Sequence, residues 1–487
     1  MVNKERKTIL VTGGAGFIGS HLIERLVREG HRVISLDNYF AGSRDNHVPG
    51  AEYREGHTKD IATHVPETPD LLYHLGEYAR VEQSVLEPQV VHDLNVRGTR
   101  GVVEFWRERG GKLVYAGSST KFGDNGRARE ATPYASTKAA NTELVREVGE
   151  RHKLAYAIAY FYNVYGPRER SGVYGTVIEM FKRMYLAGSP FAVTSPGTQK
   201  RNFTHVDDIV DGLIAVGQRG QGDEYGLGNE RAFTILEVAQ LFGGDIVMLP
   251  PRAGNRMESG LDTRKSRTLG WKPTRSLEEY IMNFTREHPR GTPRERRVLV
   301  FSTTFYPIMG PAERALATLM RKMPDVRFDI VTTRFAVKAV GPLPDAPNVE
   351  IHRSGIGQPL DKYLLPLSGF LVARALHAKH RYLFAWSLMA SYAALAGILL
   401  KYTSRLPLLV TLADQRLSDL SSLQRPFFTL VLSDADQVYG ASPSQETHAS
   451  GIFGRPLSRS SLGEGDAFAN QLRYAYAEIL MTEHSAA

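Results

Sequence analysis

Apolar runs alternate with amphipathic stretches along the first 285 residues of the chain. Ile9–Val11 is a short apolar run, and Ser20–Glu29 then carries leucine, isoleucine and valine residues on one side of a helix. The next predicted strands and helix, in chain order, are Arg32–Leu36, Asp70–Leu75, the helix Asn95–Trp106, and the strand Lys112–Ala116. Strands separated by helices at this spacing predict an α/β fold with a doubly wound parallel sheet covered on both faces.

A glycine-rich turn follows the first predicted strand. Gly13, Gly16 and Gly19 stand at G-x-x-G-x-x-G spacing, where a pyrophosphate could approach the N–H groups and dipole of the next helix. An ordinary tight turn would explain the glycines alone. However, Asp37 ends the next strand at the distance typical of an acid that binds the ribose hydroxyls of adenosine. Because a carboxylate there would repel a 2′-phosphate, these Rossmann-type features favour NAD over NADP.

Composition narrows the classes of protein that this chain can be. Its 487 residues are too many for one ordinary domain, and 42% hydrophobic with 23% charged residues is typical of a soluble globular protein. The absence of cysteine excludes disulfides and cysteine-based zinc sites. A net charge of +8 suits binding of phosphorylated small molecules or anionic membrane surfaces. The sequence has no basic tract with interleaved aromatic residues, so it does not indicate nucleic-acid binding. The N-terminal residues do not resemble a signal peptide, so we expect a cytoplasmic protein.

Tyr134 and Lys138 stand four residues apart in a predicted helix, so both side chains lie on one face. A phenol titrates near about 10 and is a poor base at neutral pH, but a nearby ammonium and an oxidised nicotinamide would both favour the phenolate. Ser118, at the end of the preceding strand, could hydrogen-bond the same substrate hydroxyl. An isolated Y-x-x-x-K pair also occurs by chance on solvated helices. Its position after a glycine-rich turn favours catalysis.

Residues 7–285 resemble the extended short-chain dehydrogenase/reductases, in particular the NAD-dependent nucleotide-sugar epimerases and dehydratases. The motifs that carry the resemblance are TGGAGFIGSHL, Asp37–Asn38, Asn95–Thr99, Phe122–Gly123, Tyr134–Lys138, Asn163–Arg168, Arg201–Asp208 and Leu269–Pro273. The resemblance implies a small substrate-binding subdomain, a homodimer, and the catalytic set Ser118, Tyr134 and Lys138. The residues it implies for NAD are Gly13, Gly16, Phe17, Ile18, Gly19, Asp37, Asn38, Leu75, Asn95, Tyr134, Lys138 and Tyr162.

The substrate half of the family pattern also has counterparts. Asn163, Arg201 and Arg252, with Ser118, match positions that bind a nucleotide-diphosphate sugar. Two arginines and an amide suit a pyrophosphate, although each arginine taken singly is better explained by a surface salt bridge.

Other polar positions are better explained by structure than by chemistry. We expect Asp207 or Asp208 to cap a helix that begins near Ile209, and His205 to be a packing or strand residue, with no metal site. Departures from the family pattern stand at His57, Glu77 and Tyr160, and Glu77 needs a partner or exposure.

The residues after the catalytic serine bear on the reaction. A 4,6-dehydratase of this group would carry an acid pair there, whereas this chain has Ser119 and Thr120. We therefore expect a nucleotide-diphosphate-sugar 4-epimerase, with a UDP-hexose favoured, that oxidises C4 transiently and reduces it again. The alternatives are another dehydratase or reductase of the family, a split or bifunctional glycosyltransferase, and a non-catalytic nucleotide-sugar scaffold.

A second α/β unit is predicted after the first. We expect a domain over residues 1–285, a charged linker over 286–297, a second domain over 298–455 and a tail with one helix over 456–487. The second domain resembles the N-terminal half of GT-B glycosyltransferases through Phe305–Pro307, Gly310–Glu313, Leu408–Asp414 and Ser433–Ser442. Too few residues follow for the nucleotide-binding half of that fold, so we expect acceptor binding, a membrane or glycan-pathway partner, or a vestigial scaffold.

One stretch of the second domain has the length of a membrane span. Leu383–Leu400 carries no charge, and by length alone it could cross a bilayer. We favour a buried strand over Tyr382–Trp386 and an alanine-rich helix, because another strand-like run, Leu408–Leu412, follows at βαβ distance.

Overall fold

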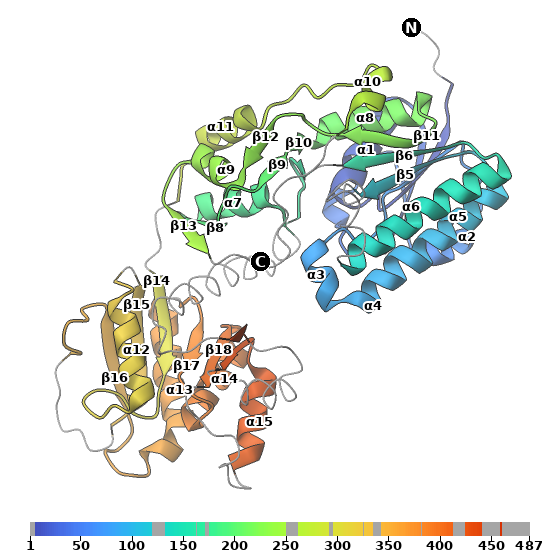
Figure 1. Ribbon diagram of the computed structural model, residues 1–487. Helices are drawn as coiled ribbons and strands as arrows, with labels where there is room; N and C mark the ends of the chain where they lie inside the picture. The colour runs from blue at the N-terminus through green and yellow to red at the C-terminus, as the bar shows by residue number, and fades with distance from the viewer. Residues whose placement is uncertain are drawn as a thin grey trace. The chain divides into compact units, whose positions relative to one another are not determined.

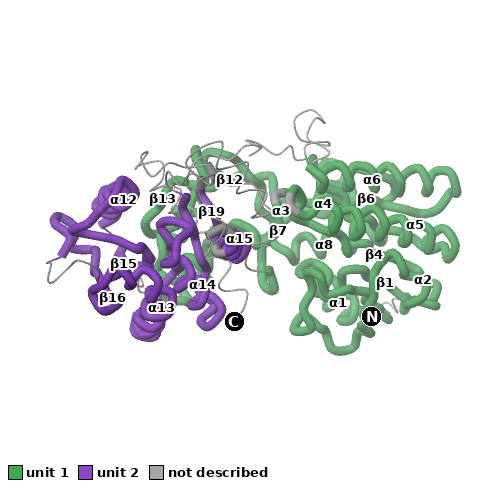
Figure 2. The backbone as a smooth tube through the Cα atoms, turned by 90° about the horizontal axis from the view of Figure 1, so that it is seen from below, with its two compact units in different colours: residues 1–292 green, residues 293–487 purple. Residues whose placement is uncertain are grey.

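A computed structural model of the chain describes residues 5–118, 132–161, 163–170, 175–249, 262–291, 296–324, 326–334, 342–380, 382–412, 424–440 and 458–459. The chain divides into two compact units, residues 1–292 and 293–487, shown in different colours in Figure 2. Each unit contains a parallel sheet with helices on both faces (Figure 1), so the predicted α/β fold class is confirmed.

The sheet of the first unit has seven described strands in the order β11-β6-β5-β4-β1-β2-β3, and every neighbouring pair is parallel. The strands are β1 (Thr8–Thr12), β2 (Arg32–Asp37), β3 (Glu52–Glu55), β4 (Leu71–His74), β5 (Lys112–Ser118), β6 (Tyr156–Phe161) and β11 (Gly222–Leu227). The chain runs outward from β1 to β3 and then returns to β4 on the other side of β1. This reversal puts the carboxyl ends of β1 and β4 at the point where doubly wound sheets bind ligands.

Helices cover both faces of this sheet (Figure 1). The helices α1 (Phe17–Arg28) and α8 (Val206–Arg219) share one hydrophobic core with the strands. The helices α2 (Ile61–His64), α5 (Gly98–Arg109) and α6 (Pro133–His152) pack on the other face, around the fully buried Trp106. Shorter elements on the way to α5 are η1 (Arg44–Asn46), η2 (Thr58–Asp60), α3 (Val81–Leu86), α4 (Pro88–Val91) and the π-helical η3 (His92–Arg97).

A smaller part of the first unit is built from three two-stranded sheets and short helices. Its strands are β7 (Val164–Tyr165), β8 (Phe191–Thr194), β9 (Lys200–Asn202), β10 (Thr204–His205), β12 (Ala232–Thr234) and β13 (Ile246–Leu249). The helices α7 (Val177–Leu186) and α9 (Ile235–Phe242) belong to this part, and α10 (Arg264–Thr268) and α11 (Leu277–Glu287) follow later in the chain.

The cap of α8 differs from the prediction. The helix begins at Val206, and His205 caps it by accepting the N–H of Asp207 on Nδ1 at 3.2 Å. Asp208 is buried and faces inward, where Arg275 donates to its carboxylate at 2.7 Å. The expectation that Asp207 or Asp208 caps this helix was therefore wrong, because the strand β10 turns into the helix earlier than its apolar pattern indicated.

The second unit repeats the strand order of the first. Its described strands run β16-β15-β14-β17-β18-β19-β20, all parallel. They are β14 (Arg296–Phe301), β15 (Val326–Thr333), β16 (Val349–Ser354), β17 (Ala385–Ser387), β18 (Leu408–Leu412), β19 (Gln437–Gly440) and β20 (Ser458–Arg459). The helices are α12 (Pro311–Arg321), α13 (Asp361–His380), α14 (Tyr392–Ser404) and α15 (Gln424–Asp434).

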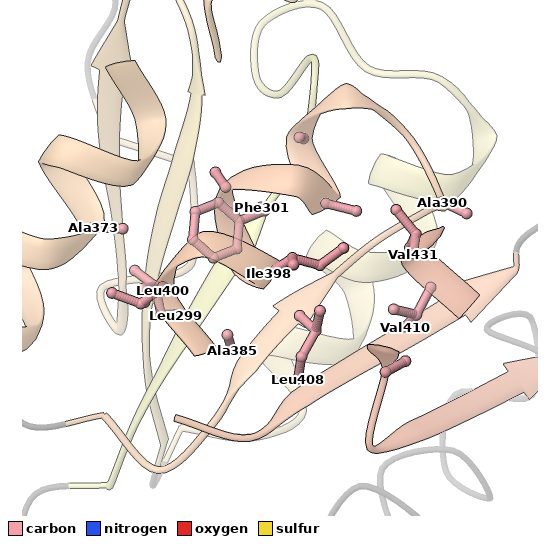
Figure 3. Packing of buried hydrophobic residues seen from close by; sticks show 14 of the residues in the cluster. Leu299, Phe301, Ala373, Ala385, Ala390, Ile398, Leu400, Leu408, Val410 and Val431 are labelled. Carbon is pink, nitrogen blue, oxygen red and sulfur yellow. The ribbon is translucent and has the colours of Figure 1, made fainter. Parts of the chain in front are cut away.

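Two cores hold the second unit together. One lies under α12, and the other lies between the sheet and α13, α14 and α15. Figure 3 shows the latter, in which Phe301 and Leu408 from the strands pack with Ile398 from α14. The uncharged stretch from Leu383 to Leu400 thus forms β17 and most of α14, as we favoured. None of the described helices has the length and apolar character needed to cross a bilayer.

Candidate functional site

The glycine turn lies between β1 and α1, at the carboxyl end of the sheet. Gly13 has a φ of +72°, and a Cβ atom there would lie 2.8 Å from the Cα of Gly76. A Cβ on Gly19 would lie 2.2 Å from the carbonyl oxygen of Gly13. Gly16 caps α1 without a side-chain hydrogen bond, which leaves the amides of Phe17 and Ile18 for an anion. The turn therefore has the compact backbone and the amide donors that suit a pyrophosphate.

Asp37 closes the adjacent strand β2 beside this turn. Its carboxylate accepts the backbone N–H of Ala15 at 2.9 Å and that of Tyr39 at 2.8 Å. Burial raises the pKa of Asp37, and the two amide donors act in the opposite direction. Because the amide of Ala15 belongs to the glycine turn, Asp37 is held directly against the turn. Asn38 follows it and accepts the N–H of Phe40 on its side chain at 3.1 Å.

The strand β4 brings Leu75 and Gly76 against the same turn. The N–H of Leu75 donates to the carbonyl of Thr12 at 3.1 Å, and the N–H of Gly76 donates to the Thr12 hydroxyl at 3.2 Å. Asn95 lies in η3 and is fully buried. Its side chain accepts the N–H of Tyr78 at 2.7 Å and donates to Thr137 of α6 at 3.0 Å. Asn95 thereby joins the segment after β4 to the helix that carries the tyrosine.

The predicted catalytic side chains lie together at the end of β5 and the start of α6. The phenol of Tyr134 donates to the hydroxyl of Ser118 at 3.2 Å. Pro133 occupies the first turn of α6, and Thr132 caps the helix by accepting the N–H of Ala135 at 3.2 Å. This cap fixes Tyr134 in the first turn of the helix. Lys138 follows one turn later and is buried.

Glu77 is the partner of Lys138. The Lys138 ammonium donates to the Glu77 carboxylate and to the carbonyl of Ala116. The two charged side chains are 6% and 4% exposed, so this ion pair lies in the interior. Burial would raise the pKa of Glu77, but Lys138 and the surrounding donors outweigh it and lower that pKa below its usual range. The carboxylate that sequence reasoning marked as needing a partner is therefore an ionised counter-ion of the predicted catalytic lysine.

Neutral donors complete the environment of Glu77. The carboxylate accepts hydrogen bonds from Asn141 at 2.6 Å, from Thr99 at 2.5 Å and from the Tyr115 phenol at 3.0 Å. The Lys138 ammonium also lies 4.7 Å from the centre of the Tyr115 ring. A buried ion pair is stable only when such additional donors satisfy it. Sequence reasoning missed this role for all three residues, because they come from three separate elements that only the fold brings together; Thr99 does belong to the Asn95–Thr99 motif.

A chain of hydrogen bonds links this carboxylate through His74 to Thr12, directly before the glycine turn. Burial lowers the pKa of His74 to about 4, so the imidazole is neutral at physiological pH. Because the Thr99 hydroxyl donates to Glu77, it accepts from Nε2–H of His74 at 2.9 Å. The other ring nitrogen, Nδ1, then accepts from the hydroxyl of Thr12 at 2.7 Å. In this series of hydrogen bonds, Thr12, His74 and Thr99 therefore each donate in the direction of Glu77.

Only part of the predicted substrate set lies in described residues. The Asn163 side chain donates to the carbonyl of Asn202 at 3.2 Å, which places it next to Arg201 on β9. Arg201 donates to the carbonyl of Lys200 at 2.8 Å. Tyr162 and Arg252 lie outside the described residues, as do Ser119 and Thr120.

The two other departures from the family pattern have structural roles. His57 precedes η2 and accepts the N–H of Lys59 on Nδ1 at 3.0 Å, while its Nε2 lies 3.1 Å from Asp93. Tyr160 is fully buried in β6, and its hydroxyl donates to Asp223 at 2.5 Å. Its ring fills the space beside Gly117, where a Cβ would lie 2.5 Å from the ring.

Comparisons with known proteins concern the first unit. Residues 9–228 match the NAD dependent epimerase/dehydratase family. The UDP-glucose 4-epimerase of Mycolicibacterium smegmatis is 30% identical over 299 residues, which cover 56% of this chain and 95% of that protein. UDP-glucuronic acid decarboxylase 1 of Xenopus tropicalis is 30% identical over 298 residues, which cover 57% of this chain and 70% of that protein.

The first unit is also similar to a solved structure. The crystal structure of UDP-glucose 4-epimerase from Thermotoga maritima with UDP-glucose is 28% identical, with a TM-score of 0.54. The match covers 57% of this chain and 99% of that one. The resemblance of residues 298–455 to GT-B glycosyltransferases stays a prediction. Because the Mycolicibacterium epimerase is matched over nearly its whole length, this chain belongs, through its first unit, to the NAD dependent epimerase/dehydratase family.

Proposed function

We propose that the first unit is a nucleotide-diphosphate-sugar 4-epimerase that uses NAD, with a UDP-hexose as its substrate. The observation that carries the proposal is the hydrogen bond of 3.2 Å between Tyr134 and Ser118, with Lys138 one helical turn away. This arrangement can take a proton from a sugar hydroxyl and give it back. The family includes epimerases, dehydratases and decarboxylases, so the finer assignment rests on the chemistry of this chain's residues.

The residues of the glycine turn fit NAD. The amides of Phe17 and Ile18 would bind the pyrophosphate, and Asp37 would accept the adenosine ribose hydroxyls. Leu75 borders the turn on the other side, and Asn95 of η3 accepts a hydrogen bond from Tyr78 in the segment that follows Leu75. Bound by these residues, NAD⁺ would supply the acceptor, and later the donor, of the hydride at C4 of the sugar.

Tyr134 carries the proton in this proposal. Its phenolate takes the proton of the sugar 4-hydroxyl, and Ser118 hydrogen-bonds the same oxygen. The resulting 4-keto sugar turns about its bond to the diphosphate and presents its other face. The same tyrosine then returns the proton to the C4 oxygen. Because the hydride removed from C4 would also be returned there, the cycle would consume no external oxidant or reductant.

Lys138 lies one helical turn from Tyr134 and is itself fixed by Glu77. Two of its three N–H donors go to Glu77 and Ala116 among the described residues, which leaves one for a ribose hydroxyl or for the phenolate. Asn163 and Arg201, with Arg252 from the predicted set, would bind the diphosphate about which the sugar turns.

The test compares three substrates with the purified full-length chain. UDP-glucose, UDP-N-acetylglucosamine and UDP-glucuronate are each incubated with the protein, and the products are separated by chromatography and identified by NMR. We expect a C4 epimer of at least one of them without net change in NADH absorbance. Release of CO₂ from UDP-glucuronate, or accumulation of a 4-keto-6-deoxy sugar, would replace the epimerase assignment with a decarboxylase or a dehydratase.

A further inference from the structure

The helix α13 of the second unit exposes a row of leucines. Leu364, Leu367 and Leu371 are 43%, 65% and 58% exposed, and Leu360, directly before the helix, is 60% exposed. Their spacing of four, three and four residues places them on one side of a helix with about 3.6 residues per turn. We call these four residues the leucine stripe.

The leucine stripe lies opposite the face of α13 that is already buried. Leu365, Gly369 and Ala373 face inward, and the helix packs against α14, β15 and β16. A helix that is apolar on all sides belongs inside a protein or against another apolar surface. Here one apolar face is covered by the unit itself, and the other faces outward. The stripe therefore exposes a continuous apolar surface that the described part of the unit leaves uncovered.

The structure holds this surface in place. Asp361 starts α13, and its buried carboxylate accepts the N–H groups of Ile356 and Gly357 at 2.8 and 2.9 Å. These bonds fix the loop before the helix, so Ile356, which is also largely exposed, stays at the end of the stripe. Tyr363 borders the stripe, and its ring meets that of Tyr392 edge-on at 5.2 Å.

The charges of α13 favour one kind of occupant. Lys362 in the first turn, and Arg374 and Lys379 toward the end, are exposed. The one acidic residue of the helix, Asp361, is buried. Two copies that paired through this helix would bring these cations together, which is unfavourable. An anionic surface instead attracts them while it takes up the leucines. Apolar residues flanked by cations and a tyrosine are typical of a helix that lies in a lipid interface.

We propose that α13 binds the second unit to the surface of an anionic lipid membrane, with the leucine stripe inserted among the acyl chains. Leu360, Leu364, Leu367 and Leu371 enter the boundary between headgroups and acyl chains, and Arg374, which borders the stripe, stays at the level of the anionic headgroups. This role goes beyond the sugar chemistry of the first unit and does not depend on it.

The test is binding of the full-length chain to lipid vesicles, measured by sedimentation. Phosphatidylcholine vesicles with phosphatidylglycerol should bind the protein more tightly than phosphatidylcholine alone, and added salt should weaken the difference. The double variant Leu367→Glu with Leu371→Glu should bind about a hundredfold more weakly, because each inserted leucine contributes about a factor of ten. Arg374→Gln should lose about fivefold, on anionic vesicles only.

Leu241→Glu is the matched control, since it places the same charge on an exposed leucine of the first unit. It should bind as the wild type does, and thermal unfolding should show that all variants are folded. The proposal is overturned if the wild type does not bind anionic vesicles at low salt, or if the double variant binds equally well. It is also overturned if vesicles do not bind and sedimentation velocity shows a dimer that the double variant abolishes, because a second copy then covers the stripe.

Discussion

The two units share one strand order but differ at their first turn. In the first unit, four residues join β1 to α1, and Gly13 and Gly16 bring the backbone close to the helix start. In the second unit, nine residues join β14 to α12. There Glu313 lies in the first turn of the helix, is 4% exposed, and accepts the Thr304 hydroxyl at 2.9 Å.

This difference teaches that the turn, and not the sheet, decides what the unit binds. A helix start lined only by amides attracts a pyrophosphate, whereas one that already holds a buried carboxylate repels it. The second strand of each unit, β2 or β15, also ends in a different kind of residue. β2 ends in Asp37, which can accept ribose hydroxyls, and β15 ends in Thr333, whose hydroxyl donates to Thr303 at 2.8 Å. Among the described residues, the first turn of the first unit therefore suits a dinucleotide better than that of the second, although both units have the same topology.

The largest expected effect concerns the proton carrier. Tyr134→Phe removes the phenol that donates to Ser118, and kcat should fall by roughly 10³-fold, the usual contribution of a positioned acid–base group. The measurement is conversion of the UDP-sugar identified in the substrate test. NAD released from the denatured protein should be unchanged, and wild-type turnover by the variant would remove Tyr134 from the proposed reaction.

Removing the buried counter-ion should chiefly destabilise the first unit. Glu77→Ala leaves the Lys138 ammonium buried without its partner, which costs about 3–5 kcal/mol of unfolding free energy. Glu313→Ala, the matched change in the second unit, should cost about 1 kcal/mol, the value of one hydrogen bond.

Denaturant titrations that follow each unit measure both changes. Combining Glu77→Ala with Lys138→Met should recover part of the stability, because it removes the unpaired charge. If the double variant is less stable than Glu77→Ala alone, the ion pair is not the source of the loss.

The two glycines before the first helices give a direct comparison of the turns. Gly13→Ala places a side chain on a residue with a positive φ, and its Cβ would clash with the backbone of Gly76. The variant should therefore lose roughly 2 kcal/mol or more of unfolding free energy and no longer retain NAD. Gly310→Ala meets only the end of the Glu313 side chain at ordinary φ and should cost about 0.5 kcal/mol. Equal losses for the two variants would show that the turns are not differently constrained.

The smallest expected effect appears in acid. The pKa of Glu77 and the pKa of Asp329 both lie below their usual values. Burial alone would raise each pKa. At Glu77 the Lys138 ammonium outweighs the effect of burial, and at Asp329 hydrogen bonds from His352, Tyr382 and Arg297 outweigh it. Each carboxylate therefore adds stability that is present above its ordinary value, 4.5 or 3.8, and is lost as the pH falls below it. Glu77→Gln should flatten this loss in the first unit alone, and Asp329→Asn in the second.

Tryptophan fluorescence can separate the units in acid, because Trp106 and Trp271 belong to the first and Trp386 to the second. A Trp386→Phe background isolates the first unit. If Glu77→Gln changes the acid transition reported by Trp386, the two units do not unfold independently.

Local patterns predicted the sheet and the turn but not the polar interior. The strands β1, β2, β4 and β5 follow from apolar runs, and the Tyr134–Ser118 bond could be expected because both residues lie where a strand end meets a helix start. The partner of Glu77 could not, since Lys138 lies 61 residues further along the chain and only the packed fold brings the two together. A carboxylate inside an apolar environment signals that a partner exists, but its identity is a property of tertiary structure.

The direction of the hydrogen bonds through His74 makes the imidazole a spectroscopic reporter. Its proton sits on Nε2 only as long as Thr99 donates to a charged Glu77. Neutralising that carboxylate, as in Glu77→Gln, lets an amide donate back and allows the ring to exchange its proton to Nδ1. Nitrogen chemical shifts of the His74 ring would then distinguish the two tautomers, and so report the charge beside Lys138 without any turnover.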